Sequence, residues 1–388
     1  MEISACVKYV GVNDHQVDLF EGQYKVPNGM SYNSYVILDD KIAIMDTVDG
    51  FFTEEWLNNV EQVLDGKMPD YLVIQHMEPD HSASIPAFLK KYPKVTVVST
   101  AKGFQFMEQF FPEFFAEQGL PAEQRIVAAN DGILELGQHS LHFVYAPMVH
   151  WPEVMMTYEA TEKILFAADG FGKFGALDVE EEWTDEARRY YIGIVGKYGP
   201  QVQAVLKKAA GLDIQTICSL HGPVLKKNLG FYLEKYDKWS SYQPEESGVV
   251  IAYASVYGNT RNAAEYLADV LQEKGQKTVL YDLARCDKAK AVADAFRYDR
   301  LVLAGITYNG DLFPCMRSFI EGLTERNYQN RKVAIIENGT WAPMAGKLIL
   351  GMFEKSKNLT FTETTVSIKS AMNEQNKGEI GKLAEELC

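Results

Sequence analysis

Short apolar runs recur along the first 240 residues, and their length and β-branched content predict buried strands. These runs are Tyr32–Leu38, Ile42–Met45, Asp70–Ile74, Val95–Ser99, Leu141–Tyr145, Ile164–Ala168 and Thr216–Leu220. The polar pair Asp39-Asp40 separates the first two runs, so together they predict a β-hairpin. Two longer segments, Glu186–Ala210 and Leu229–Trp239, predict helices.

Beyond residue 248 the pattern changes to a strict alternation of strand and helix. The predicted strands are Val249–Ala254, Thr278–Leu283, Arg300–Gly305, Lys332–Glu337 and Phe361–Val366, and the predicted helices are Thr260–Lys274, Lys288–Phe296, Met316–Leu323, Ala345–Glu354 and Gly378–Leu387. Five strands with crossover connections predict a doubly wound parallel sheet. The polar segment Ser241–Gly248 is the best linker candidate because it contains Pro and Gly. We therefore expect two domains, residues 1–245 and 249–388.

Composition restricts the class of protein. The chain has 388 residues, 47% of them hydrophobic and 23% charged, which suits two packed cores. The net charge of −15 argues against nucleic acid or an anionic membrane as a partner. No apolar run approaches the roughly 20 residues that span a bilayer, and no signal peptide is evident. The five cysteines are scattered without a Cys-x-x-Cys pair, which indicates a reducing, cytoplasmic location.

Seven candidate metal ligands form the most informative feature of the chain: His76, Glu78, Asp80, His81, His150, Asp169 and His221. Four of them lie within six residues, directly after a predicted strand, although the whole chain has only seven histidines. Asp169 and His221 also follow predicted strands, so the set is expected at one rim of a layered α/β domain. Four imidazoles and three carboxylates are too many for one four-coordinate zinc ion. They suit two metals with a bridging carboxylate.

Three loops in the second half predict a flavin site. The first is Ser255, Val256, Tyr257, Gly258, Asn259 and Thr260, where a strand ends and a helix begins, and it suits a phosphate group. The others are Thr307, Tyr308, Asn309, Gly310 and Asp311, and Asn338, Gly339, Thr340, Trp341 and Ala342. They follow the third and fourth strands of this half and are expected beside the isoalloxazine, with Tyr308 and Trp341 stacking on it. The domain has no room for a second nucleotide unit, which favours FMN over FAD.

The ligand pattern resembles that of the metallo-β-lactamase superfamily, in which His-x-His-x-Asp-His is followed by a distant His, Asp and His. Glu78 stands where the hydrolases carry their second His, and its added negative charge favours a redox metal. With the flavin loops attached, nearly all of the chain resembles a flavodiiron protein. The segments that carry this resemblance are Gly29–Tyr35, the His76 run, Pro147–Pro152, Ala168–Gly172, Ser219–Pro223 and the three flavin loops.

The resemblance implies an N-terminal metallo-β-lactamase-like αββα sandwich and a C-terminal flavodoxin-like domain. It implies that His76, Glu78 and His150 bind the iron nearer the flavin, that Asp80, His81 and His221 bind the distal iron, and that Asp169 bridges them. The implied activity is reduction of O2 to water, of NO to N2O, or both, with O2 favoured. The chain ends at Cys388, so we expect a separate electron donor such as rubredoxin or a reduced deazaflavin cofactor. A head-to-tail homodimer, or a tetramer built from it, is expected.

Two other functions fit parts of the sequence. A zinc hydrolase of the glyoxalase II or lactamase kind would keep the metal ligands, and Glu78 is the residue that argues against it. A flavoprotein electron carrier would use the first half only as a dimerisation scaffold, and the complete ligand set argues against that. No residue in the sequence decides between O2 and NO.

Overall fold

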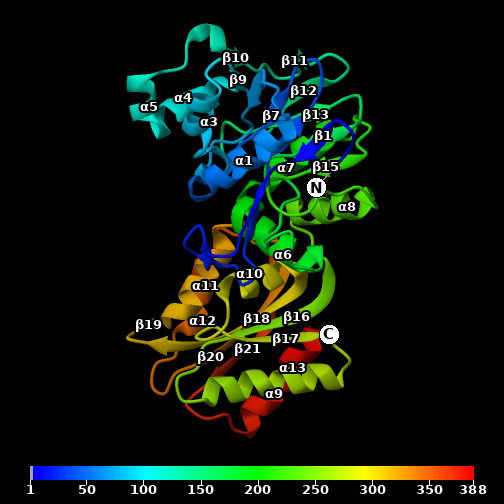
Figure 1. The fold of residues 1–388 in the computed structure, drawn as a ribbon. Helices are drawn as coiled ribbons and strands as arrows, with labels where there is room; N and C mark the ends of the chain where they lie inside the picture. Colours follow the sequence, from blue (N-terminus) through cyan, green and yellow to red (C-terminus); the bar gives the residue numbers. More distant parts are fainter. Residues whose placement is uncertain (1–2) are drawn as a thin grey trace. The chain divides into compact units, whose positions relative to one another are not determined.

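The computed structural model describes residues 3–388 and divides into two compact units (Figure 1). The first unit runs to Tyr191 and resumes over Pro200–Tyr236, and the second takes Ile192–Gly199 and Asp237–Cys388. None of the helices among the described residues is long and apolar enough to cross a membrane. The fold is α/β throughout, as the sequence predicts.

The first unit contains two sheets whose inner faces share one core. The first sheet has the order β1 (Val7–Tyr9), β6 (Tyr35–Ile37), β7 (Ala43–Met45), β8 (Tyr71–Val73), β9 (Thr96–Ser99) and β10 (Arg125–Val127). The second has the order β11 (Ile133–Glu135), β12 (Ser140–Tyr145), β13 (Met155–Glu159), β14 (Ile164–Phe166) and β15 (Thr216–Cys218). Buried side chains of both sheets, such as Ile37, Val73, Phe143 and Phe166, form one hydrophobic cluster. This is the expected sandwich.

Helices and smaller strand pairs complete this unit. The helices are α1 (Thr53–Leu64), α2 (Pro79–Ser82), α3 (Ile85–Lys91), α4 (Ala101–Phe110), α5 (Pro112–Glu117), α6 (Trp183–Tyr190), α7 (Gly199–Ala209) and α8 (Leu229–Ser240), although the first residue of α7 and the last turn of α8 fall in the second unit. Two short antiparallel pairs precede them, β2 (Val12–Asp14) with β5 (Met30–Tyr32) and β3 (Leu19–Phe20) with β4 (Tyr24–Lys25). Short 3-10 turns lie at η1 (Gly50–Phe52) and η2 (Ala122–Gln124).

Two sequence expectations need correction here. The run Tyr32–Leu38 is not one strand, because the chain leaves β5 at Tyr32 and enters β6 at Tyr35, which pairs antiparallel with β7 as the predicted hairpin. The segment Glu186–Ala210 is not one helix either. A π-helical turn, η3 (Tyr191–Val195), and a 3-10 turn, η4 (Gly196–Tyr198), separate α6 from α7. Three glycines lower the helix propensity there, and Pro200, which has no N–H to donate, suits only the first turn of α7.

The second unit is built on one parallel sheet of five strands. Their order is β17 (Thr278–Asp282), β16 (Glu246–Tyr253), β18 (Tyr298–Tyr308), β20 (Arg331–Asn338) and β21 (Leu359–Ile368), and β19 (Asp311–Leu312) pairs with the end of β18. In order of sequence this is 2-1-3-4-5, the doubly wound order of flavodoxin. The linker is shorter than the predicted segment Ser241–Gly248, because Glu246–Gly248 already belong to β16.

Helices cover both faces of this sheet (Figure 1). They are α9 (Asn259–Glu273), α10 (Lys288–Arg297), α11 (Pro314–Thr324), α12 (Ala345–Met352) and α13 (Glu374–Glu386). Leu267 and Leu271 of α9 and Ile380 and Leu383 of α13 share one buried cluster with the sheet. The carboxyl ends of β16, β18 and β20 carry the three predicted flavin loops, so these loops meet at one edge.

Candidate metal centre and flavin site

The compact ligand run lies at the carboxyl end of β8. His76 follows the strand, Glu78 is the N-cap residue of α2, and Pro79 occupies the first helical position. Proline suits that position because its missing N–H would have no helical partner there. Asp80 and His81 lie within the single turn of α2, and His81 is fully buried. Strand, cap and turn thus direct all four side chains into one region.

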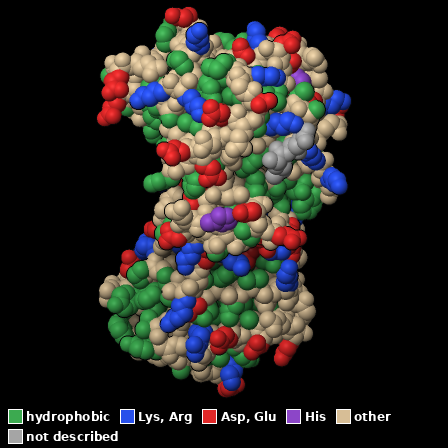
Figure 2. Space-filling view, viewed as in Figure 1, with side chains coloured by type: hydrophobic (Ala, Val, Ile, Leu, Met, Phe, Trp, Pro, Cys, Tyr) green, Lys and Arg blue, Asp and Glu red, His purple; other side chains and the backbone are tan. Residues whose placement is uncertain are grey.

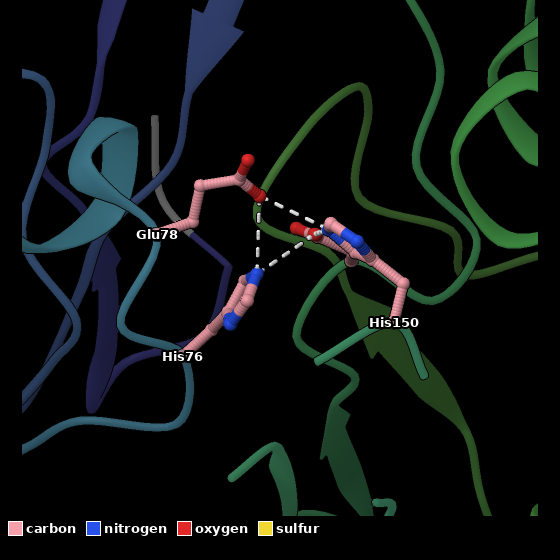
Figure 3. A group of neighbouring side chains, drawn as sticks. His76, Glu78 and His150 are labelled. Carbon is pink, nitrogen blue, oxygen red and sulfur yellow. Dashed lines mark hydrogen bonds and ion pairs between the residues drawn. The ribbon is translucent and has the colours of Figure 1, made fainter. Parts of the chain in front are cut away.

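The first group of donors consists of His76, Glu78, His150 and Asp169, whose ligand atoms lie within 4.8 Å of one another. In Figure 3, His76, Glu78 and His150 point toward a common space. Glu78 Oε2 lies 3.2 Å from His76 Nε2 and 3.0 Å from His150 Nε2. Asp169 Oδ2 lies 3.4 Å from His76 Nε2 and 3.0 Å from His150 Nε2.

The second group consists of Asp80, His81 and His221. Asp80 Oδ2 lies 3.3 Å from His81 Nε2 and 3.2 Å from His221 Nε2. The other oxygen of Asp169, Oδ1, lies 3.3 Å from His81 Nε2 and 3.9 Å from His221 Nε2. Asp169 therefore directs one oxygen to each group, which is the geometry of a bridging carboxylate.

These residues fit metal ions, because their ligand atoms crowd together in the protein interior and face one another. Both carboxylate oxygens of Asp80 and both of Asp169 are buried and have no hydrogen-bond partner outside the cluster, where they contact only the histidine Nε2 atoms. Buried carboxylates are costly unless they are paired or bind metal. The Nε2 atoms of His81 and His221 also face each other at 3.1 Å, although two imidazoles offer no mutual attraction without a shared proton or cation. Two adjacent cations bridged by Asp169 satisfy all these atoms.

The electrostatics of the ligands reflects their mutual pairing. Burial alone would lower the pKa of His150, but hydrogen bonds to Asp169 and Glu78 raise it to about 9. Burial would raise the pKa of Asp169, yet the charge of His76 and hydrogen bonds from the histidines hold it well below its usual range. The pKa of His76 is raised well above its ordinary value by Asp169, despite its burial. The neighbouring opposite charges thus stabilise the charged form of each ligand against its burial.

A second layer of residues orients these ligands, and sequence reasoning missed it. Glu153 is almost fully buried, and its Oε1 accepts from His76 Nδ1 at 2.8 Å and from the Met77 N–H at 2.9 Å. Because Glu153 occupies Nδ1 of His76, the Nε2 atom is the one left to coordinate a metal, and this arrangement is common at metal sites. On the other side, His221 Nδ1 lies 2.7 Å from the Ser31 carbonyl oxygen. In the sequence, the one indication of a role for Glu153 is its position three residues after the candidate ligand His150.

The loop that carries His221 is fixed by the segment between β5 and β6. Asn33 Nδ2 donates to the carbonyl oxygens of Ser219 at 2.9 Å and Gly222 at 2.8 Å. The Tyr35 hydroxyl donates to the same Ser219 oxygen at 2.6 Å. Asn33 lies in the break between β5 and β6, and from there its side chain reaches the loop that carries His221.

The flavin loops line one cavity of about 550 Å³ in the second unit. Thirteen of the sixteen loop residues, all but Val256, Asp311 and Ala342, are predicted to contact the flavin. Of these thirteen, all but Gly258 line the cavity: Ser255, Tyr257, Asn259, Thr260, Thr307, Tyr308, Asn309, Gly310, Asn338, Gly339, Thr340 and Trp341. Sequence reasoning did not name Val256, Ile306, Ala342, Met344 and Ser370 as contacts, although they also line the cavity. Four of these five are apolar, so they carry little chemical signal of their own.

The first flavin loop has the geometry of a phosphate cradle. Gly258 has a φ of 92°, in the left-handed region that favours glycine, and its N–H donates to Ser255 Oγ at 3.2 Å. The helix α9 begins at Asn259 without a side-chain cap, and its first two residues, Asn259 and Thr260, line the cavity. A helix N-terminus of this kind attracts a phosphate dianion.

The other two loops use their polar side chains to hold themselves in place. Thr307 Oγ1 accepts from the N–H groups of Met344 at 2.8 Å and Ala345 at 3.2 Å. The Asn338 amide exchanges two hydrogen bonds with the backbone of Ser370. Tyr257 and Trp341 are 93% and 89% exposed, which leaves their rings free for a ligand. Figure 2 shows hydrophobic side chains gathered where Figure 1 places β19 and α12.

Comparisons with known proteins match both halves of the chain. Residues 30–222 match the sequence model of the ODP family beta lactamase, and residues 250–358 match that of a flavodoxin domain. The first range contains all seven candidate metal ligands, and the second contains all three flavin loops. Fold and site thus define a flavoprotein with a metallo-β-lactamase-like metal domain.

Relatives and solved structures narrow the class. A nitric oxide reductase of Moorella thermoacetica is 28% identical over 88% of this chain and 86% of its own. The flavodiiron protein of Giardia intestinalis is 25% identical with a TM-score of 0.90, covering 100% of this chain and 96% of that one. The rubredoxin oxygen:oxidoreductase of Desulfovibrio gigas is 24% identical with a TM-score of 0.92, covering 100% and 97%. The chain belongs to the flavodiiron proteins. It spans about half the length of the Synechocystis diflavin flavoproteins it also matches.

Proposed function

We propose that this protein is an oxidoreductase that reduces O2 to water, NO to N2O, or both, at a di-iron centre supplied with electrons through FMN. The single observation that carries this proposal is the pair of donor groups that share Asp169, one oxygen to each. The names of the relatives support both gases, since they include a nitric oxide reductase and an oxygen oxidoreductase. We favour O2 as the main substrate and propose that the activity protects against oxidative or nitrosative stress.

We assign the ligands residue by residue. His76, Glu78 and His150 would hold one iron, Asp80, His81 and His221 the other, and Asp169 both. We assign the metal domain to residues 1–245 and the FMN domain to 249–388. When bound, the two irons would supply the redox chemistry that reduces a diatomic gas, and FMN would supply the electrons.

The chain's own residues determine how that chemistry is controlled. Glu78 replaces a neutral ligand of the hydrolases with a negative charge, which stabilises the higher oxidation state of a metal. Glu153 orients His76, and the Ser31 carbonyl orients His221, so that each Nε2 faces the metal. In the second unit, the exposed ring of Trp341 would cover one face of the isoalloxazine.

Reduction of a gas requires a supply of electrons, and this requirement indicates which partners the protein needs. We propose a separate one-electron or two-electron donor, such as rubredoxin or a reduced deazaflavin cofactor. We also propose a head-to-tail homodimer, in which the FMN of one subunit serves the iron centre of its partner, possibly paired further into a tetramer. The five cysteines among the described residues are all free thiols, which supports a reducing, cytoplasmic location.

One preparation tests the function. Purified protein should hold two irons and one FMN per chain, and should consume O2 and NO when a donor is supplied. Two zinc ions, no iron and no gas consumption would instead indicate a hydrolase. For the dimer, a variant that lacks FMN (Thr260 and Asn309 changed) is mixed with a variant of His81. Subunit exchange should restore about a quarter to a half of the activity. A fully active monomer would refute the arrangement.

A further inference from the structure

A second cluster of metal-ligand side chains lies in the first unit, apart from the di-iron centre. Cys6, His139 and Glu162 each offer one ligand atom, and these atoms lie within 4.8 Å of one another. His139 is 5% exposed, while Cys6 and Glu162 are partly exposed. Thiolate, imidazole and carboxylate together are a donor set that binds zinc.

The cluster lies at the end of the sandwich opposite to the di-iron centre. Glu162 precedes β14, whereas Asp169 follows it. His139 directly precedes β12, and Cys6 directly precedes β1. Cys6 therefore lies beside the start of a strand of the first sheet, and the other two residues lie beside the starts of strands of the second. A metal held here would join the two sheets at the end that the iron ligands do not reach.

The histidine is already oriented for coordination. Asp39 Oδ2 lies 2.8 Å from His139 Nδ1 and also accepts from the His139 N–H at 2.7 Å. Asp39 is itself anchored, because it follows β6 and its Oδ1 accepts from the Asp40 N–H at 2.8 Å. A carboxylate on Nδ1 leaves Nε2 as the donor atom, which is the arrangement found behind metal-bound histidines.

The spacing of the donor atoms suits a tetrahedral ion. His139 Nε2 lies 3.3 Å from Glu162 Oε1. Zinc bonds of about 2.0–2.2 Å to nitrogen and oxygen put two ligand atoms of a tetrahedron roughly 3.3–3.6 Å apart. The Cys6 sulfur lies within 4.8 Å of both of these atoms and supplies the third ligand. A water molecule can take the fourth position on the exposed side.

The local field also favours a cation. Burial raises the pKa of the Cys6 thiol, and the carboxylates of Glu162, Asp39 and Glu159 raise it further, while Lys8 lowers it. Hydrogen bonds to Asp39 and Glu162 likewise raise the pKa of His139 against the effect of its burial. Three carboxylates thus surround one thiol and one imidazole, and a divalent ion would replace the protons that these two groups otherwise hold.

We propose that Cys6, His139 and Glu162 form a structural site for Zn²⁺ or a similar thiophilic divalent ion, separate from the di-iron centre and independent of the proposed function. On binding, the Cys6 thiol releases one proton to solvent, and Nε2 of His139 binds the ion in its deprotonated form. The site would fasten the start of β1 to the turn before β14.

Cobalt is the probe, because only a thiolate ligand produces a sulfur-to-cobalt charge-transfer band in the near ultraviolet, and the di-iron ligands include no sulfur. Iron-loaded protein titrated with Co²⁺ should gain one ion per chain, together with this band and the visible bands of tetrahedral cobalt. Zn²⁺ should displace both signals. In Cys6→Ser the charge-transfer band should vanish and the affinity should fall at least about tenfold. Cys286→Ser is the matched control and should bind as the parent does.

Two further variants keep the test independent of folding defects. Glu162→Gln leaves the thiolate in place and should weaken binding while retaining the charge-transfer band. In each variant, iron and FMN contents should equal those of the parent, which shows that the fold is intact. The proposal is overturned if millimolar Co²⁺ produces no thiolate band, or if Cys6→Ser keeps the band and the extra ion.

Discussion

The two cofactor sites are built by opposite strategies. At the metal centre, His76 and His81 are fully buried and Asp169 is 1% exposed, so the packing of the core fixes the positions of these ligands. At the flavin site, the aromatic residues that would touch the ligand are among the most exposed in the chain. The core of the sandwich therefore preorganises the metal centre. At the flavin site, hydrogen bonds hold the backbone of the loops, while the aromatic side chains stay exposed until a ligand covers them.

This difference has a physical origin. Metal–ligand bonds are short and directional, so a ligand displaced by a fraction of an ångström binds the metal poorly. Tight packing around the ligands prevents such displacements. A flavin binds through area and stacking, which tolerate small shifts. Mutations should therefore act steeply and specifically at the metal centre and mildly at the flavin aromatics.

The largest effect is expected from Asp169→Ala. Loss of the bridge leaves each donor group without its shared ligand, so gas reduction should fall on the order of a thousandfold or more while FMN stays bound. Iron content and steady-state O2 and NO consumption check this. Asp213→Ala, which removes an exposed carboxylate paired with Lys163, is the control and should behave as the parent. Parent-like turnover in Asp169→Ala would refute the bridging role.

Glu153→Gln should weaken iron binding by roughly 10–100-fold without removing a ligand, because His76 loses the carboxylate that orients it. Iron retention during competition with a chelator measures this. Glu159→Gln is the matched control, since Glu159 is equally buried and its oxygens accept only backbone N–H groups, of Thr161 and Glu162. Equal iron retention in the two variants would show that Glu153 only packs.

Metal uptake should depend on pH. In the metal-free protein the pKa of His150 is raised to about 9, so this group is protonated at pH 7 and an incoming cation must displace its proton. The apparent affinity for Fe²⁺ should thus rise by about tenfold per pH unit between pH 6 and pH 8, for each proton displaced, and level off above pH 9. Proton release on anaerobic Fe²⁺ addition gives an independent reading. Uptake that does not change with pH would contradict the account.

The smallest effect is expected at the flavin site. Trp341→Ala removes a stacking surface worth about 1 kcal/mol, which corresponds to roughly fivefold weaker FMN binding. Trp341→Phe should keep most of the affinity, because it keeps an aromatic face. Fluorescence titration of the apoprotein with FMN measures both. A loss of iron in either variant would be incompatible with separate sites.

Sequence reasoning succeeded where chemistry or periodicity is local. The run from His76 to His81 and the loop Ser255–Thr260 are visible as motifs, and the strand–helix alternation after residue 248 predicted the parallel sheet and its helices. It failed where long-range contacts decide. No element was predicted for Thr53–Leu64 or Met155–Glu159, which the structure shows as α1 and β13.

The orienting residues could not be predicted for the same reason. Glu153 and Asn33 act on partners that lie 77 and 186 residues away in the sequence, and neither belongs to a local motif. Cys6 and Glu162 likewise meet only because the two sheets pack together. Isolated polar residues acquire roles from the topology of the sandwich, and this information is not present in any short window of sequence.

The most direct test of the central claim is the reaction of fully reduced, iron-loaded protein with limiting O2, followed by flavin absorbance in a single turnover. Two electrons from the reduced flavin and one from each iron would reduce one O2 per chain to water, and the flavin should reoxidise rapidly without release of hydrogen peroxide. Asp169→Ala should reoxidise only as slowly as an ordinary exposed flavin, with peroxide as the product. Equal rates and equal peroxide yields in the parent and the variant would contradict the account.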